Sequence, residues 1–68
     1  MKFTDYKVVE SPVIGTALDF EDFLEGVNDG RYHTVRGENL KNVHVILISV
    51  APSMALGKYL TVWGVPAQ

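Results

Sequence analysis

The stretch VHVILISVA, residues 43–51, constrains this chain most, because it is almost unbroken apolar sequence. A strand in a small one-layer sheet alternates, with one face in the core and the other in water. A continuous apolar strand is instead typical of a sheet that is covered on both faces. A chain of 68 residues has few elements to spare for a second cover. The stretch therefore predicts association with something outside the chain.

The length and the absence of cysteine point the same way. Sixty-eight residues predict a single domain, over residues 1–68. A domain this small is marginally stable unless a disulfide, a metal or a partner subunit supports it. The sequence contains no cysteine, which excludes disulfides and thiolate metal sites. Oligomerisation is the remaining support, and we expect a homodimer or a larger homo-oligomer.

The charge pattern does not indicate a nucleic-acid or membrane partner. The six basic residues are scattered singly and the formal net charge is −2, whereas phosphate backbones need clustered Lys and Arg. The start of the chain lacks the apolar region of a signal peptide. The longest apolar stretch is about half of the roughly 20 residues that a membrane span requires. We therefore expect a cytoplasmic protein.

The predicted element order is β-α-β-β-β. Hydrophobic patterning and turn residues predict a helix over 18–30, a short extended piece at 13–16, loops at 37–42 and 52–57, and strands over 2–10, 31–36, 43–51 and 58–65. The fold class is α+β: one small domain with one helix packed on a mostly antiparallel sheet of three or four strands.

The helix has the clearest local signal in the chain. Its apolar stripe recurs at i, i+3, i+4 and i+7, and Asp19 is placed to cap its N-terminus. Gly30 is placed for a left-handed C-terminal cap. The outer face is acidic, and it is either a solvated face or a docking surface for a basic partner. The residues predicted to bind a partner are Glu21, Asp22 and Glu25 on this face, with Met54 and Leu56 in the loop 52–57. That loop could instead fold back on the core.

The expected homo-oligomer interface follows from pairing Arg36 with Val43 across a hairpin. One helix covers one face of the sheet, so the opposite face must be buried between copies. The alternative is that residues 13–16 or the C-terminal residues cover it. The residues predicted to form the interface are Val35, His44, Ile46, Ile48, Val50 and Trp63.

The sequence contains no motif that indicates catalysis. The serines lie in no nucleophile-elbow pattern, and no phosphate-binding loop is present. Two histidines, His33 and His44, could share a metal ion, but no third ligand is placed to complete a site. The sequence therefore predicts no enzyme, no cofactor and no metal. A small anionic ligand, with a nucleotide as the first candidate, could lie between subunits against Arg31, Tyr32, Arg36 and Tyr59.

DYKVVE, followed by FLEGVNDGRY, resembles the opening of a group of tiny uncharacterised bacterial and phage domains. These join a Tyr-Lys-Val-Val strand to a helix and a hairpin, and the resemblance covers residues 5–36. This chain differs in Arg31-Tyr32 after Gly30, in a longer spacer at 11–18 and in an added strand at 58–65. The resemblance implies a fold and a bacterial or phage origin. It implies no catalytic or binding residue.

The expected function is that of a small non-enzymatic oligomeric binding protein of viral (phage) origin, which acts as an inhibitor. It would block or sequester a host component in the host cytoplasm. The alternatives are a sponge for nucleotide-like molecules, with pockets between subunits, and a purely structural assembly unit.

Overall fold

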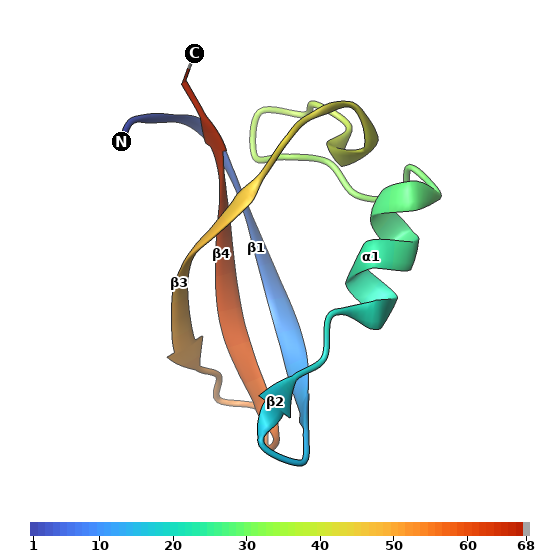
Figure 1. Cartoon of the computed structure of the whole chain (residues 1–68), viewed down its shortest axis with the longest axis vertical. Coiled ribbons are helices and arrows are strands. Elements are labelled where there is room, and N and C mark those ends of the chain that lie inside the picture. Colours follow the sequence, from blue (N-terminus) through green and yellow to red (C-terminus); the bar gives the residue numbers. More distant parts are fainter. Residues whose placement is uncertain (68) are drawn as a thin grey trace.

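The computed structural model describes residues 1–67, and it confirms the α+β class (Figure 1). One helix accompanies a four-stranded antiparallel sheet with the order β2-β1-β4-β3. The elements in chain order are β1 (Phe3–Ile14), β2 (Ala17–Leu18), α1 (Glu21–Asn28), the 3-10 turn η1 (Leu40–Asn42), β3 (Ile46–Pro52) and β4 (Lys58–Pro66).

β1 is longer than the sequence predicts, since it continues through Pro12 to Ile14. Proline is tolerated on the open edge of a strand, where no ladder hydrogen bond is lost. There, the backbone N–H of Asp19 donates to the carbonyl of Pro12 at 2.8 Å. The chain then turns at Gly15, whose φ of +64° favours glycine, and returns as β2. The predicted extended piece 13–16 is therefore the end of β1 and this turn.

The helix forms where its apolar stripe predicts, but it is shorter than 18–30. Phe20, and not Asp19, occupies the N-cap position. Asp19 still serves the helix start, because its carboxylate accepts from the backbone N–H of Glu21 at 3.0 Å. At the other end Gly30 has φ +74° and Arg31 N–H donates to Gly26 O at 2.9 Å. The C-terminal glycine cap is confirmed.

The prediction of a strand over 31–36 is wrong. These residues belong to the loop between α1 and β3 (residues 29–45), which also contains η1. The loop has one isolated bridge, between His33 and Asn39. Thr34 N–H donates to Glu38 O at 2.8 Å, and Val35 N–H donates to Tyr6 O at 2.9 Å. The loop thus satisfies its backbone groups within itself and on β1, so the β-branched residues that suggested a strand have no need of a neighbouring strand.

The small core lies between α1, the loop and the sheet. Phe23 is 5% exposed and Leu40 is 1% exposed. The ring of Phe23 packs against the rings of Trp63 and Tyr32, with centroids 5.2 and 5.3 Å apart. Phe20 meets Trp63 edge to face at 5.3 Å. These aromatic contacts, rather than an extended helix–sheet interface, hold α1 in place.

A buried polar group lies on the same face of the sheet. The side chain of Thr61 is fully buried. Its hydroxyl accepts from the indole N–H of Trp63 at 2.9 Å and donates to the carbonyl of Val9 at 3.0 Å. The Ser11 hydroxyl lies 3.1 Å away. Since buried polar atoms must be paired, this group fixes the orientation of Trp63 beneath the helix.

The surface is large for the mass of the chain. Its accessible area is 4818 Å². A compact monomer of 7.5 kDa exposes roughly 4,200 Å² by the usual scaling of area with mass. Within residues 1–67, Phe23 and Leu40 are the only apolar side chains that are buried. The fold has a core, but much of its apolar content lies outside that core.

Candidate functional site

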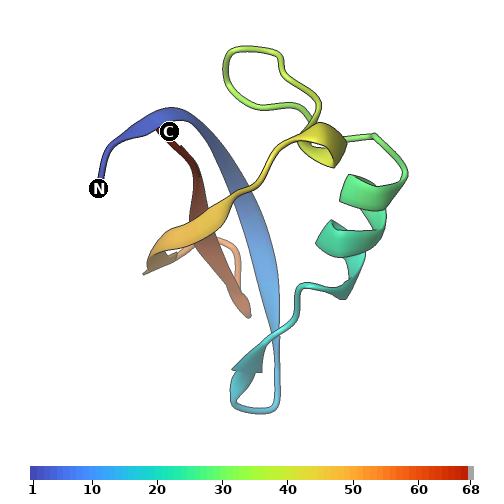
Figure 2. The same ribbon diagram turned by 45° about the horizontal axis from the view of Figure 1, so that its top comes forward.

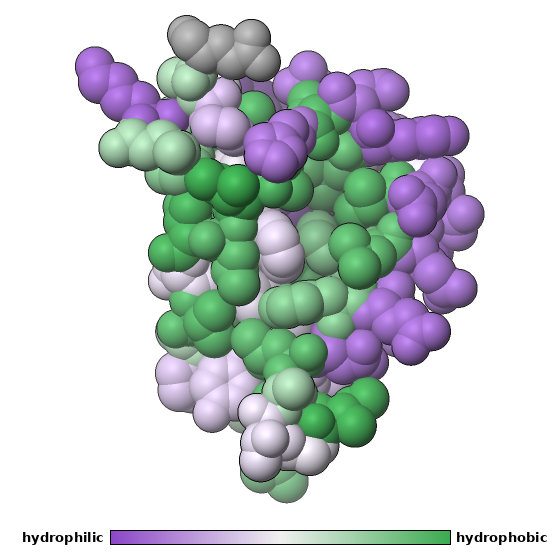
Figure 3. Space-filling model, in the orientation of Figure 1, coloured by the Kyte–Doolittle hydropathy of each residue, from purple (hydrophilic) through white to green (hydrophobic). Residues whose placement is uncertain are grey.

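The exposed apolar residues gather away from the helix and the loop. Figures 1 and 2 show α1 and the loop beside β1, while β3 runs out to the other side of the sheet. In Figure 3 hydrophobic side chains cover the β3 side, and hydrophilic ones cover the outer side of α1. The exposed large hydrophobic residues in the sheet or its connections are Tyr6, Val8, Ile14, Leu47, Ile48, Val50, Met54, Leu56, Tyr59 and Leu60.

β3 is an edge strand with apolar side chains on both faces. It is the last strand in the sheet order, paired on one side with β4. Every residue from Leu47 to Pro52 is exposed. The strand sequence ILISVAP carries no charge. An exposed apolar edge strand offers both unpaired backbone groups and exposed hydrophobic side chains, and proteins usually protect such edges. We therefore take β3 as the centre of the candidate interaction surface.

A bulge in β3 overturns the predicted grouping of interface residues. Alternation would put Ile46, Ile48 and Val50 on one face. The pairing with β4 shifts register between Leu47 and Ser49, so one extra residue is inserted at Ile48. Ile46 pairs with Gly64 while Val50 pairs with Thr61, which places Ile46 and Val50 on opposite faces. The predicted Arg36–Val43 hairpin, on which that grouping rested, does not form.

The other predicted interface residues lie in different places. Trp63 is half-buried on the helix-facing side, against Phe20 and Phe23. Val35 is 77% exposed at the tip of the loop, and His44 is exposed on the segment that leads into β3. A single chain therefore does not present the six predicted residues as one surface.

An apolar groove lies beside β3. It is lined by Val13, Thr16, Leu18, Val50 and Tyr59 and has a volume of about 320 Å³. β2 supplies Leu18, and β3 supplies Val50. α1 is only eight residues long and does not extend over this part of the sheet (Figure 1). The groove is therefore the part of the helix-facing side that the helix leaves open.

The predicted partner-binding residues are accessible. Glu21, Asp22 and Glu25 are exposed along the outer side of α1, which is the hydrophilic flank in Figure 3. Met54 and Leu56 are fully exposed in the β3–β4 connection. That connection turns at Gly57, where φ is +76°, and does not fold back on the core. The helix flank and this connection lie on different elements, so the two predicted contacts form separate surfaces.

The predicted ligand residues are dispersed within one chain. Arg31 forms a solvent-exposed ion pair with Asp29, at 3.5 Å. Tyr32 packs under the helix, with the Lys7 ammonium 5.2 Å from its ring centroid. The Arg36 guanidinium donates to the Thr4 carbonyl at 3.3 Å. Tyr59 lies in β4, opposite Ser11 and Pro52.

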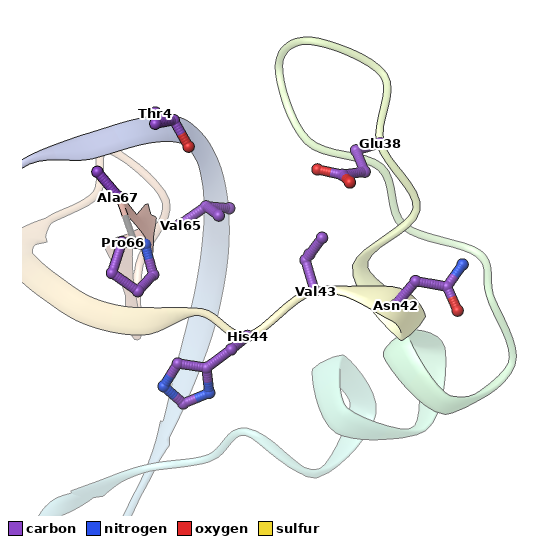
Figure 4. A pocket seen from close by; sticks show the side chains of 8 residues that line it. All are labelled: Thr4, Glu38, Asn42, Val43, His44, Val65, Pro66 and Ala67. Carbon is purple, nitrogen blue, oxygen red and sulfur yellow. The ribbon is translucent and has the colours of Figure 1, made fainter.

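A more polar hollow opens between the loop and the end of the sheet (Figure 4). Its volume is about 410 Å³, and it is lined by Thr4, Glu38, Asn42, Val43, His44, Val65, Pro66 and Ala67. Glu38 and His44 are its titratable groups. Over residues 1–67 there is no cluster of three or more side chains suited to holding a metal. Sequence reasoning missed this hollow, because it joins segments about 60 residues apart in the chain.

Asp5 is a second feature that sequence reasoning missed. Its side chain is buried and accepts from the backbone N–H groups of Tyr6 at 2.9 Å and Arg36 at 3.2 Å. Burial, the largest influence, raises the pKa of Asp5. The hydrogen bonds from Thr34, Tyr6 and Arg36 and the charge of Arg36 outweigh burial, so its pKa is lowered overall. Asp5 fastens the loop to β1, and nothing local in the sequence signals that contact.

The comparisons with known proteins identify no relative. A scan against protein-family models found no match, and searches of curated proteins and of solved structures found none either. None of the helices within residues 1–67 has both the length and the apolar character needed to cross a bilayer.

Proposed function

We propose that this chain is a non-enzymatic binding protein that works as a homo-oligomer. One observation carries the proposal. Of the apolar side chains in residues 1–67, two are buried, while thirteen large ones are exposed. Monomeric soluble proteins rarely expose apolar surface on this scale without using it for binding.

The area of the chain supports oligomerisation. Its 4818 Å² exceeds the area of a compact monomer by about 600 Å². A standard protein interface buries about 800 Å² on each partner. Removing an excess of this size from water would contribute on the order of 10 kcal/mol before the costs of association. This is comparable to the whole stability of an ordinary domain, so association matters to the folding of a cysteine-free chain.

The exposed helix flank supports the second half of the proposal, which is binding to another protein. Glu21, Asp22 and Glu25 lie on α1, beside β1, whereas β3 lies on the opposite side of the sheet. Copies that associate through β3 would leave the acidic flank free. We propose that this flank docks a basic surface of a host protein and blocks it, in the manner of a small phage inhibitor. Because the predicted ligand residues lie apart, a protein target takes precedence over a small ligand.

Native mass spectrometry of protein taken directly from cells tests the oligomer and reports any bound molecule. We expect a dimer or a larger closed oligomer at micromolar concentration. A well-folded monomer at every concentration would contradict the proposal.

The docking flank is tested by charge reversal. The double variant Asp22→Lys/Glu25→Lys should lose the bound partner and keep the oligomer. Glu10→Lys/Glu38→Lys makes the same change in net charge on other exposed acidic residues, and it should keep both. Equal partner binding by the two doubles would rule out the helix flank.

A further inference from the structure

We infer that the interface between copies is the edge of β3, and that two β3 strands pair antiparallel about a two-fold axis into one continuous sheet. This inference rests on the proposed function, because it names the surface through which the oligomer forms. Its occupant is a second copy of this chain.

The composition of β3 suits pairing with itself. At a two-fold axis each residue meets the same strand on the other copy, so any charge on the strand lies near an identical charge. Like charges opposite one another destabilise a strand pair. β3 carries none between Ile46 and Pro52, although edge strands that must stay single are commonly protected by charged side chains. A second copy therefore meets no electrostatic barrier along this strand.

The backbone of β3 has polar groups available for the pair. Along a strand, successive residues direct their N–H and C=O groups to alternate edges. The N–H of Ser53 donates to the carbonyl of Lys58 at 3.2 Å, so Ser53 faces the β4 side. By alternation Pro52 and Val50 face the open edge. Pro52 has no N–H to offer, and this leaves Val50 as the residue between the bulge and Pro52 with both groups free for a partner strand.

Two features limit the pair to a short, closed contact. Pro52 at one end and the bulge at Ile48 at the other interrupt a regular ladder. At the far edge of the sheet β2 has two residues, and the carbonyls of Tyr6 and Pro12 on β1 accept from Val35 and Asp19. The stretch of β1 between them carries the charged residues Lys7 and Glu10, which disfavour edge pairing. A two-fold contact uses the same strand on both copies, and the other edge of the sheet is protected, so the pair closes as a dimer and does not extend into a fibre.

The side chains beside the edge add buried area on both faces of the sheet. Leu47 and Val50 pair with Trp63 and Thr61 on the helix-facing side, and Ser49 pairs with Val62 on the other. Leu47 is 39% and Val50 45% exposed. Edge-to-edge pairing places a partner strand beside the side chains on both faces of β3. Packing one sheet face on another would cover the side chains on one face only. This difference makes the inference testable.

Four lysine substitutions at exposed positions distinguish the possible interfaces. Val50→Lys and Ser49→Lys place a charge on opposite faces of β3. Val8→Lys places it on the outer face of the sheet, away from β3, and Ala17→Lys places it on the other edge. We expect the first two to be monomers, with a dimer dissociation constant at least tenfold higher than that of the parent chain. The other two should remain dimers, as measured by native mass spectrometry and by light scattering with dilution.

A cysteine scan gives a second readout that does not depend on loss of association, and it uses a chain that has no cysteine of its own. Oxidised Val50→Cys should form a disulfide-linked dimer, because the two copies of this residue lie opposite each other at the two-fold axis, with Cβ atoms about 4.5–5.5 Å apart, close to the separation that a disulfide needs. Ser49→Cys should link more slowly, because a pair centred on Val50 places Ser49 opposite Ala51 of the second copy, and diagonal neighbours lie about 7–8 Å apart. Ala17→Cys should remain unlinked at the same concentration.

The outcomes separate this inference from the function it rests on. A parent chain that is a folded monomer would overturn both. A parent dimer that survives Val50→Lys and Ser49→Lys but dissociates with Val8→Lys would overturn the β3 interface, in favour of face-to-face packing, and leave the oligomeric function standing. A parent dimer with no disulfide-linked product from Val50→Cys would likewise overturn the β3 interface.

Discussion

The half of the sheet around β1 and the half around β3 use apolar residues in opposite ways. On the β1 side, α1 and the loop bury Phe23 and Leu40 and fasten themselves through Asp5. On the β3 side, each residue from Leu47 to Pro52 is exposed. Both sides are rich in leucine, isoleucine and valine, so hydrophobicity alone does not separate them. Position relative to the single helix therefore decides which apolar residues are buried in the fold and which stay exposed.

Element lengths explain the difference. α1 has eight residues and is about 12 Å long at the helical rise of about 1.5 Å per residue. β1 has twelve residues, which follow a path of about 40 Å at the rise of about 3.3 Å per residue in a strand. A helix of this length covers only part of such a sheet. The covered part of the sheet ends where α1 and the loop end, and the exposed part around β3 begins there.

A leucine-to-alanine series at three exposures gives the largest expected effect and tests the comparison directly. Leu40, Leu47 and Leu56 are 1%, 39% and 102% exposed. Leu40→Ala should lower the free energy of unfolding by about 2–5 kcal/mol. Leu47→Ala should lower it less, and Leu56→Ala should change it by less than about 0.5 kcal/mol. Urea denaturation at concentrations where the protein is monomeric measures all three. Equal losses at Leu40 and Leu47 would break the distinction between the two sides.

The next largest loss of stability is expected when the hydrogen bonds of the buried Thr61 hydroxyl, beneath the helix, are removed. Thr61→Val removes the hydroxyl that accepts from the Trp63 indole and contacts Ser11. The partners left unpaired in a buried site should lower the free energy of unfolding by about 1–3 kcal/mol. Since Trp63 is the single tryptophan, its fluorescence reports the same change. Thr16→Val, at an exposed position, is the matched control and should be close to neutral.

The contact between α1 and the loop is probed at Gly26. A Cβ at this position would overlap the ring of Tyr32. Alanine favours a helix over glycine by about 1 kcal/mol, but overpacking typically costs about 1–3 kcal/mol. We expect Gly26→Ala to destabilise the chain by about 1 kcal/mol net, as measured by thermal unfolding. Asn28→Ala on the exposed side of the same helix should stabilise it slightly. A gain for Gly26→Ala would mean that Tyr32 does not pack on the helix.

The attachment of the loop by Asp5 gives the smallest effect, which depends on pH. The pKa of Asp5 is lowered by its hydrogen bonds and by Arg36, against the opposing effect of burial. A lowered pKa in the folded chain adds stability above the unfolded value of about 3.9, and that stability is lost as the pH falls through the folded value. Asp5→Asn should therefore lower the unfolding temperature at neutral pH and reduce its decline in acid. Asp22→Asn on the exposed helix flank should follow the parent chain. Parallel acid curves for Asp5→Asn and the parent would contradict this attachment.

The sequence predicted correctly the features that depend on residues close together in the chain. The stripe of Phe20, Phe23, Leu24 and Val27 predicted the helix, and Gly30 predicted its end. Leu24 is nevertheless exposed. The strand over 31–36 failed because Thr34 and Val35 satisfy their backbone groups in a loop held by Asp5, 29 or more residues earlier in the chain. The predicted interface residues were gathered by an alternation that the bulge at Ile48 breaks.

By itself, the sequence determined that the chain is a small α+β domain, that one short helix accompanies several strands, and that the apolar content is too large for the cover available. These properties follow from composition, periodicity and length. Only the tertiary structure decided which strand lies at the edge, which face each residue of β3 presents, and which residues fasten the loop. Those features depend on pairings between residues far apart in the chain, and a register shift of one residue reverses the face of every side chain that follows it.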